Sequence, residues 1–152
     1  MKLVTVTWQP GHDAFVAHGA RPDRPITMNA PHEGDPTGIS PSETLLAAVG
    51  GCTAWDVVEV LRKGRQPVRG VEVRVAGEQA ADAPHQYTHL LITYVVTGRG
   101  LDPARVERAV SLSLDRYCSV IATVRGVAAI DTAVEIVEES PAEEALTPAE
   151  RD

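Results

Sequence analysis

The chain has 152 residues, which suits one domain, and 43% of them are hydrophobic but only 4% aromatic. We therefore expect a core of Val, Leu, Ile and Ala, with little stacking surface for bases or flat cofactors. The formal net charge is −7, but residues 138–152 hold six acids and one base and so carry −5, leaving −2 for the rest. A nearly neutral body argues against a nucleic-acid partner.

The chain start gives no sign of export or membrane insertion. Residues 1–13 lack the continuous apolar stretch of a signal peptide, and no run approaches the roughly 18 apolar residues of a membrane-spanning helix. Its two cysteines, 66 positions apart, are not the disulfide framework of a secreted protein. These features predict a cytoplasmic protein with no membrane partner.

The first part of the chain predicts an antiparallel meander. Short strands are expected over residues 2–8, 13–18 and 24–29, because each is apolar or β-branched, and a loop rich in Gly, Pro and Asp follows.

A long helix is expected next, from a capping box to Gly64. Ser40 is a favoured N-cap, Pro41 suits the first helical position, and Glu43 stands at the third. The first half of this helix is apolar on nearly all sides, which predicts burial on most of its surface. Three strands alone cannot cover such a helix, so a homodimer is expected.

The second half of the chain predicts more strands and helices, giving a βββ-α-ββ-α-(short α)-β order and the α+β class. Strands are expected over residues 71–77, 88–97 and 132–137, and helices over residues 103–118 and 119–124. The domain is expected to span residues 1–139, and the acidic tail over residues 140–152 is expected to be disordered.

The two cysteines stand out as candidate functional residues, although each also suits a buried core position. Cys52 lies mid-helix after Gly50 and Gly51, and two glycines there cost on the order of 1 kcal/mol each. They indicate a close approach by a helix, a partner subunit or a substrate. Cys118 precedes a segment that is expected to begin a helix, whose free N–H groups would favour a thiolate.

Other chemistries are weaker. No pair of cysteines or histidines has zinc-ligand spacing on a helix, and His85 and His89 are expected to face solvent, so neither a metal nor a cofactor is expected. No serine lies in a strand–turn–helix elbow of the kind a Ser-His-Asp triad uses. A basic cluster at the helix end is explained by the helix dipole. It comprises Arg62, Lys63, Arg65 and Arg69.

Two segments resemble the OsmC/Ohr family and look most like its YhfA-like branch. The run SPSETLLAAVGGCTAWDVVEVLRKGRQ resembles the family's central helix, and RAVSLSLDRYCSV resembles the segment that bears its second cysteine. The resemblance covers about residues 2–138. It implies two half-sheets around long central helices in an intertwined homodimer. It also implies that Cys52 attacks an organic hydroperoxide, that Cys118 then forms a disulfide with it, and that a dithiol, such as a lipoylated protein, reopens the bond.

The sequence departs from the family pattern at the helix start. Peroxidases of the family carry a glutamate directly after the helix-starting proline, where this chain has Ser42, with Glu43 one position later. That shift rotates a helical side chain by about 100°, and a capping-box role explains Glu43 better. The family also uses an arginine from the N-terminal sheet, for which Arg24 and Arg21 are candidates.

Three functions follow from the resemblance and its departures. The first is a thiol-dependent organic hydroperoxide reductase that defends against oxidative stress, with Cys52 and Cys118 as catalytic residues and Glu43 and Arg24 as further candidates. The second is a non-catalytic small-molecule-binding protein that keeps the fold. The third is a redox sensor whose Cys52–Cys118 disulfide alters a partner contact.

Overall fold

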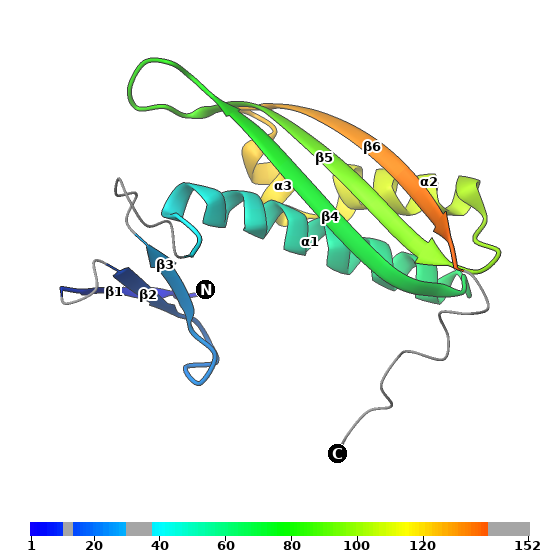
Figure 1. The fold of residues 1–152 in the computed structure, drawn as a ribbon, viewed down its shortest axis with the longest axis horizontal. Coiled ribbons are helices and arrows are strands. Elements are labelled where there is room, and N and C mark those ends of the chain that lie inside the picture. Colours follow the sequence, from blue (N-terminus) through cyan, green and yellow to red (C-terminus); the bar gives the residue numbers. More distant parts are fainter. Residues whose placement is uncertain (11–13, 30–37, 140–152) are drawn as a thin grey trace. The chain divides into compact units, whose positions relative to one another are not determined.

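The computed structural model describes residues 1–10, 14–29 and 38–139, in two compact units, Met1–Ala47 and Ala48–Asp152. The first unit holds one three-stranded sheet, and the second holds another together with the shorter helices (Figure 1). The α+β class is therefore confirmed. The expected disordered tail over residues 140–152 lies outside the described residues.

The first sheet is the predicted antiparallel meander, in the order β1 (Thr5–Gln9), β2 (Ala14–His18) and β3 (Ile26–Asn29). Two boundaries differ from the prediction. β1 starts at Thr5 rather than at residue 2, and β3 starts after Pro25, which has no N–H for a strand ladder. Residue 13, the predicted start of β2, lies outside the described residues.

The register of this sheet collects apolar side chains on one face. Trp8 lies opposite Phe15, which lies opposite Met28, and the neighbouring row is formed in the same way. Directly opposed residues point to the same face of a sheet. The face therefore carries Val6, Trp8, Phe15, Ala17, Ile26 and Met28. Trp8 is 57% exposed and Val6 and Ile26 are 53% exposed, so much of this apolar face is uncovered in the single chain.

Helix α1 (Pro41–Lys63) begins and ends where the sequence predicts. Its capping box is complete, because the Ser40 N–H donates to Glu43 Oε2 at 2.8 Å and the Glu43 N–H donates to Ser40 Oγ at 3.2 Å. These bonds satisfy backbone donors that have no partner within the helix.

The prediction that α1 is buried on most sides does not hold for the single chain. Its buried residues form one stripe at spacings of one, three or four residues, so only one face is covered. The stripe comprises Val49, Gly50, Thr53, Val57 and Leu61. Leu45 and Trp55 are exposed. By length and composition alone, α1 is also long and apolar enough to cross a membrane, a test that core helices pass as well.

The second sheet has the order β4-β5-β6, and its strands are longer than the sequence predicts. β4 (Val68–Gln79) pairs antiparallel with β5 (Tyr87–Gly98), and β5 pairs parallel with β6 (Ala129–Glu138). Alternate residues of β5 supply the centre of the core, and the helices lie against this face (Figure 1). The fully buried side chains include Leu61, Leu90, Ile92, Tyr94, Val96, Val106 and Ile121.

The predicted second helix changes from α-helical to π-helical geometry before it reaches Cys118. Asp102 caps α2 (Pro103–Leu112) by accepting from the Ala104 N–H, as the sequence predicts. The chain then widens into a π-helical segment, η1 (Ser113–Tyr117), where the Cys118 N–H donates to Ser113 O at 2.9 Å. Helix α3 (Ser119–Val124) follows and confirms the predicted short helix. Cys118 thus stands between two helical segments.

Candidate active site

The fold of the second unit brings both cysteines and one carboxylate together. The sulfur atoms of Cys52 and Cys118 and a carboxylate oxygen of Asp56 all lie within 4.8 Å of one another. Cys52 and Asp56 are four residues apart on α1 and so share one helix face. Both cysteines are free thiols in this structure. The two residues singled out from sequence are therefore neighbours, and Asp56 joins them.

Cys118 has the more enclosed thiol. Its exposure is only 3%, whereas Cys52 is half-buried. The sequence analysis expected free N–H groups to favour a thiolate here, and Cys118 Sγ does accept from the Ile121 N–H at 3.4 Å. Burial and the neighbouring Cys52 outweigh that bond and raise the pKa of the Cys118 thiol to about 11. The N–H groups of α3 therefore favour the thiolate as predicted, but their effect is smaller than that of burial and Cys52.

Asp56 is held in place by a fully buried serine. Ser113 Oγ, in the first turn of η1, donates to Asp56 Oδ2 at 2.9 Å. Because the wider π-helical turn ends at Cys118, the same segment positions both the serine and the second thiol. The arrangement presents a carboxylate to two thiols.

Tyr94 adds a second polar group to the interior beside this cluster. It is fully buried, and its hydroxyl has no hydrogen-bond partner among the residues that the structure describes. The nearby Thr53 hydroxyl donates instead to the carbonyls of Val49 and Gly50, at 3.2 and 3.1 Å. Burial raises the pKa of Tyr94, the Thr53 hydroxyl offsets part of that rise, and the charges of Cys118 and Asp56 add to it.

The two glycines before Cys52 have different surroundings. A Cβ on Gly50 would lie 3.3 Å from Val75 Cγ2 and 3.7 Å from the Val73 carbonyl, so Gly50 lets α1 pack closely on β4. The close approach predicted from sequence exists at Gly50, but the neighbour is strand β4 of the same chain rather than a helix, a partner subunit or a substrate. A Cβ on Gly51 would meet nothing within 4 Å. The helix surface at Gly51 is therefore open in the single chain.

An open hollow of about 280 Å³ adjoins the cluster through Asp56. Its rim includes Trp55, which is 67% exposed, and Tyr117, which is 55% exposed. Trp55 directly precedes Asp56 on α1, and Tyr117 directly precedes Cys118. The remaining lining residues are Glu59, Val60 and Lys63. The lining thus combines aromatic and aliphatic surface with two carboxylates and one lysine.

The other two candidate residues lie in the first unit. Glu43 Oε2 accepts from both the N–H and the hydroxyl of Ser40, which lowers the pKa of this carboxyl. Arg24 Nε lies 4.0 Å from Asp23 Oδ2, and both side chains are about three-quarters exposed. The structure thus gives Glu43 a capping role, and the catalytic roles of Glu43 and Arg24 stay predictions.

The thiol–carboxylate cluster is also the described group best suited to hold a metal. Two thiolates and one carboxylate are donors that zinc accepts, but a tetrahedral site needs a fourth. Sequence reasoning expected no metal because it weighed only cysteine and histidine spacing. His89 is engaged elsewhere, since its Nε2 lies 2.9 Å from Asp131 Oδ2.

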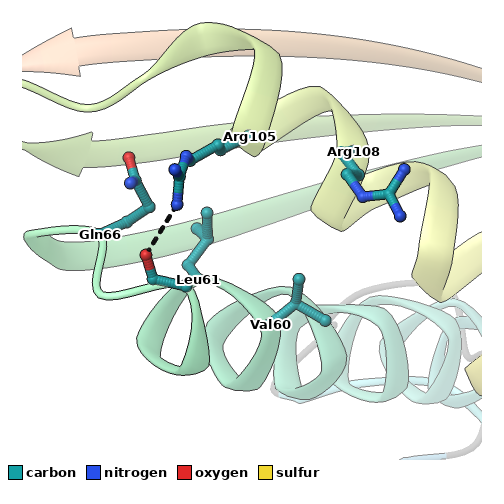
Figure 2. Close-up of a pocket in the computed structure, with 6 residues that line it drawn as sticks. Val60, Leu61, Gln66, Arg105 and Arg108 are labelled. Atoms are coloured by element: carbon teal, nitrogen blue, oxygen red, sulfur yellow. Dashed lines mark hydrogen bonds between the residues drawn. The ribbon is translucent and has the colours of Figure 1, made fainter.

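A second hollow, of about 270 Å³, lies at the C-terminal end of α1 (Figure 2). There Arg105 Nη1 donates to the Gly64 carbonyl at 3.1 Å, which stabilises the end of the helix. Members of the basic cluster are paired with acids: Lys63 with Glu59 at 3.3 Å and Arg69 with Glu139 at 3.9 Å. These contacts agree with the structural role expected for the cluster.

Sequence reasoning missed Asp56, Ser113 and Tyr94. Asp56 had a readable signal, because four residues after Cys52 is the next position on the same helix face. Ser113 and Tyr94 had no such signal. Ser113 lies 57 residues from Asp56 along the chain, and Tyr94 lies on the separate strand β5.

Comparison with known proteins places these observations in a family. Residues 33–133 match the model of the family described as OsmC-like protein. "Protein YhfA" of Escherichia coli K12 is 51% identical over 81 residues, which cover 53% of this chain and 60% of that protein. Less than two thirds of that curated relative's length is therefore matched.

Solved structures share the fold over nearly the whole chain. A hypothetical protein from Aquifex aeolicus VF5 is 27% identical with a TM-score of 0.80, over 92% of this chain and 98% of that one. The organic hydroperoxide resistance protein OhrB of Bacillus subtilis is 17% identical with a TM-score of 0.59, over 90% and 98%. At that identity the latter shows the fold alone. The chain belongs to the OsmC-like family.

Proposed function

We propose that this protein is a thiol-dependent peroxidase that reduces organic hydroperoxides in the cytoplasm and defends against oxidative stress. The observation that carries the proposal is the cluster of Cys52, Cys118 and Asp56 within 4.8 Å. A peroxide-reducing thiol needs a resolving thiol nearby, and the cluster offers one. Membership of the OsmC-like family supports the same chemistry.

The reaction has two oxidative steps. The Cys52 thiolate attacks the terminal oxygen of the hydroperoxide, so an S–O bond forms, the O–O bond breaks and the alkoxide leaves to take up a proton. Cys118 then condenses with the Cys52 sulfenic acid, forming the disulfide and releasing water. A dithiol reductant, for which a lipoylated protein is the expected source, reduces the disulfide and restores both thiols.

The exposure of the two cysteines supports the roles proposed for them. Cys52 is half-buried beside the open surface at Gly51, whereas Cys118 is enclosed and its pKa is raised to about 11. A nucleophile that meets an external substrate needs access and a thiolate, so Cys52 is the attacking group. Cys118 needs to reach only Cys52, which suits a buried resolving thiol.

The hollow beside Asp56 supports an apolar substrate. Trp55 and Tyr117 border it together with Asp56, and both present large exposed surfaces. Burying such surfaces against an alkyl chain is favourable by roughly 25 cal/mol per Å². An alkyl or lipid hydroperoxide would gain this contact, whereas hydrogen peroxide would not.

A homodimer completes the proposal. The apolar face of the first sheet and the uncovered side of α1 leave Trp8, Ile26, Leu45 and Trp55 exposed in one chain. Exposed large apolar side chains of this kind mark an interaction site. A second copy is the partner that the family resemblance implies, and it would cover the same surfaces in both chains.

The test is peroxide consumption by the purified protein with a dithiol, using cumene hydroperoxide and hydrogen peroxide. The wild type should consume cumene hydroperoxide faster than hydrogen peroxide. Cys52→Ser should reduce the rate to background. Cys118→Ser should consume at most one equivalent before stalling, with a sulfenic acid that dimedone traps on Cys52.

The proposal fails if the wild type and Cys52→Ser consume peroxide at the same rate. One observation favours a second candidate in that event, because Glu43, the acid nearest the family's activating position, already serves Ser40. The protein would then be a non-catalytic binding module. Native mass spectrometry of the protein as purified should show a retained small molecule in that case.

A further inference from the structure

We infer that Asp56 is the proton acceptor for Cys118 when the Cys52–Cys118 disulfide forms. The inference rests on the proposed function, because it concerns the second oxidative step of that reaction. It adds a catalytic residue on α1 that is distinct from Glu43 and Arg24.

The step needs such a group because Cys118 must lose its proton to attack. Cys118 is only 3% exposed, and a thiol with a pKa near 11 is ionised in about one molecule in several thousand at pH 7.5. A nearby base removes this obstacle by accepting the proton as the S–S bond forms.

Asp56 has the right position for this transfer. One of its carboxylate oxygens lies within 4.8 Å of both sulfur atoms, a span that one bridging water can relay. Ser113 Oγ donates to Oδ2 at 2.9 Å, which fixes the carboxylate and leaves Oδ1 as a further acceptor. Among the described residues, the other titratable groups beside Cys118 are the Cys52 thiol and the buried Tyr94 phenol. The Cys52 sulfur is the electrophile in this step, and the raised pKa of Tyr94 keeps its phenol protonated.

The proposed transfer balances. The Cys118 sulfur attacks the sulfur of the Cys52 sulfenic acid while its proton passes to the Asp56 carboxylate. The S–S bond forms, the S–O bond breaks, and the departing hydroxide takes the proton from Asp56 and leaves as water. Asp56 ends the step as a carboxylate, the electron pair of the S–S bond comes from the Cys118 sulfur, and the electron pair of the S–O bond leaves with the hydroxide.

The experiment is a single turnover with one equivalent of cumene hydroperoxide in chelator-treated buffer, quenched in acid and followed by intact mass. Sulfenic acid appears as the gain of one oxygen, and disulfide as the loss of two hydrogens. Asp56→Asn keeps the shape and an oxygen that can accept from Ser113. Asp115→Asn is the matched control, because it makes the same change where the carboxylate bonds Ser111 and Arg125 instead.

Timed separately from the appearance of sulfenic acid, its conversion to the disulfide should be roughly 10- to 100-fold slower in Asp56→Asn than in the wild type at pH 7. Its rate should rise about tenfold per pH unit between pH 7 and 9, because it then follows the thiolate fraction of Cys118. The wild type and Asp115→Asn should show a much flatter profile. Ser113→Ala should fall between them, since the carboxylate remains but is less well held.

Two outcomes overturn the inference. The first is equal disulfide rates and equal pH slopes in Asp56→Asn and the wild type. The second is a wild type that arrives with one chelatable zinc ion that Asp56→Asn lacks, which would assign Asp56 to a metal. If neither protein forms any sulfenic acid or disulfide, the proposed function itself fails, and the inference with it.

Discussion

The two three-stranded sheets of this protein bury their apolar residues to very different extents. In β5, Leu90, Ile92 and Val96 are at most 1% exposed, because the helices of the same unit cover that face. In the first sheet, Val6, Trp8 and Ile26 are more than half exposed. The second unit thus has a core within one chain and holds the thiols, whereas the first leaves its apolar face exposed. The proposed homodimer would cover that face.

The sharpest test of this contrast is a core truncation in the second unit. Ile92→Ala should lower the free energy of unfolding by about 2–5 kcal/mol, because it opens a cavity at a fully buried position. Leu91→Ala is the matched control on the opposite face, where the side chain is 42% exposed, and should cost less than about 1 kcal/mol. Urea denaturation at fixed protein concentration measures both. Equal losses would contradict the location of the core.

The first sheet should respond through association. Trp8→Arg places a charge on its apolar face, so we expect the dimer to dissociate while the second unit stays folded. Thr7→Arg changes the opposite face of the same strand and should leave the dimer intact. Size-exclusion chromatography with light scattering decides between them. A wild type that is monomeric at micromolar concentration would remove the basis for the contrast.

Alkaline pH should weaken the second unit through Cys118. Its pKa is raised in the folded protein, so above the unfolded-state value of about 8.5 the unfolded chain loses this proton while the folded chain keeps it. Stability is therefore lost as pH rises from about 8.5 towards 11. The melting temperature of the wild type should fall more steeply over this window than that of Cys118→Ser. Parallel pH profiles would show that the buried thiol does not contribute.

Acidic pH should lower the stability of the first unit, and this is the smallest of the expected effects. The bonds from Ser40 lower the pKa of Glu43, so their contribution is present above its ordinary value of 4.5 and is lost as pH falls further. Glu43→Gln can still cap but does not titrate. We expect the wild type to melt slightly higher at pH 7 and the difference to vanish near pH 3. A difference that persists in acid would point to another cause.

The starts of the first two helices could be predicted from the sequence, because the capping residues lie within a few positions of each start. Ser40, Pro41 and Glu43 lie within four positions, and so do Asp102 and Pro103, and both predicted helices begin there. The π-helical turn from Ser113 was not readable, because it depends on where the second helix must end so that Cys118 faces α1. No short sequence pattern encodes that demand.

For the candidate site, the sequence by itself determined the two cysteines, the capped apolar helix that carries Cys52, and the α+β order of elements. Periodicity and capping decide these within a few residues. Only the tertiary structure decided that Cys52 and Cys118 are neighbours, that Asp56 and Ser113 stand beside them, and that burial keeps Cys118 protonated. These properties depend on groups from α1, β5 and η1 meeting in one place, because distance and desolvation are set by packing rather than by neighbours along the chain.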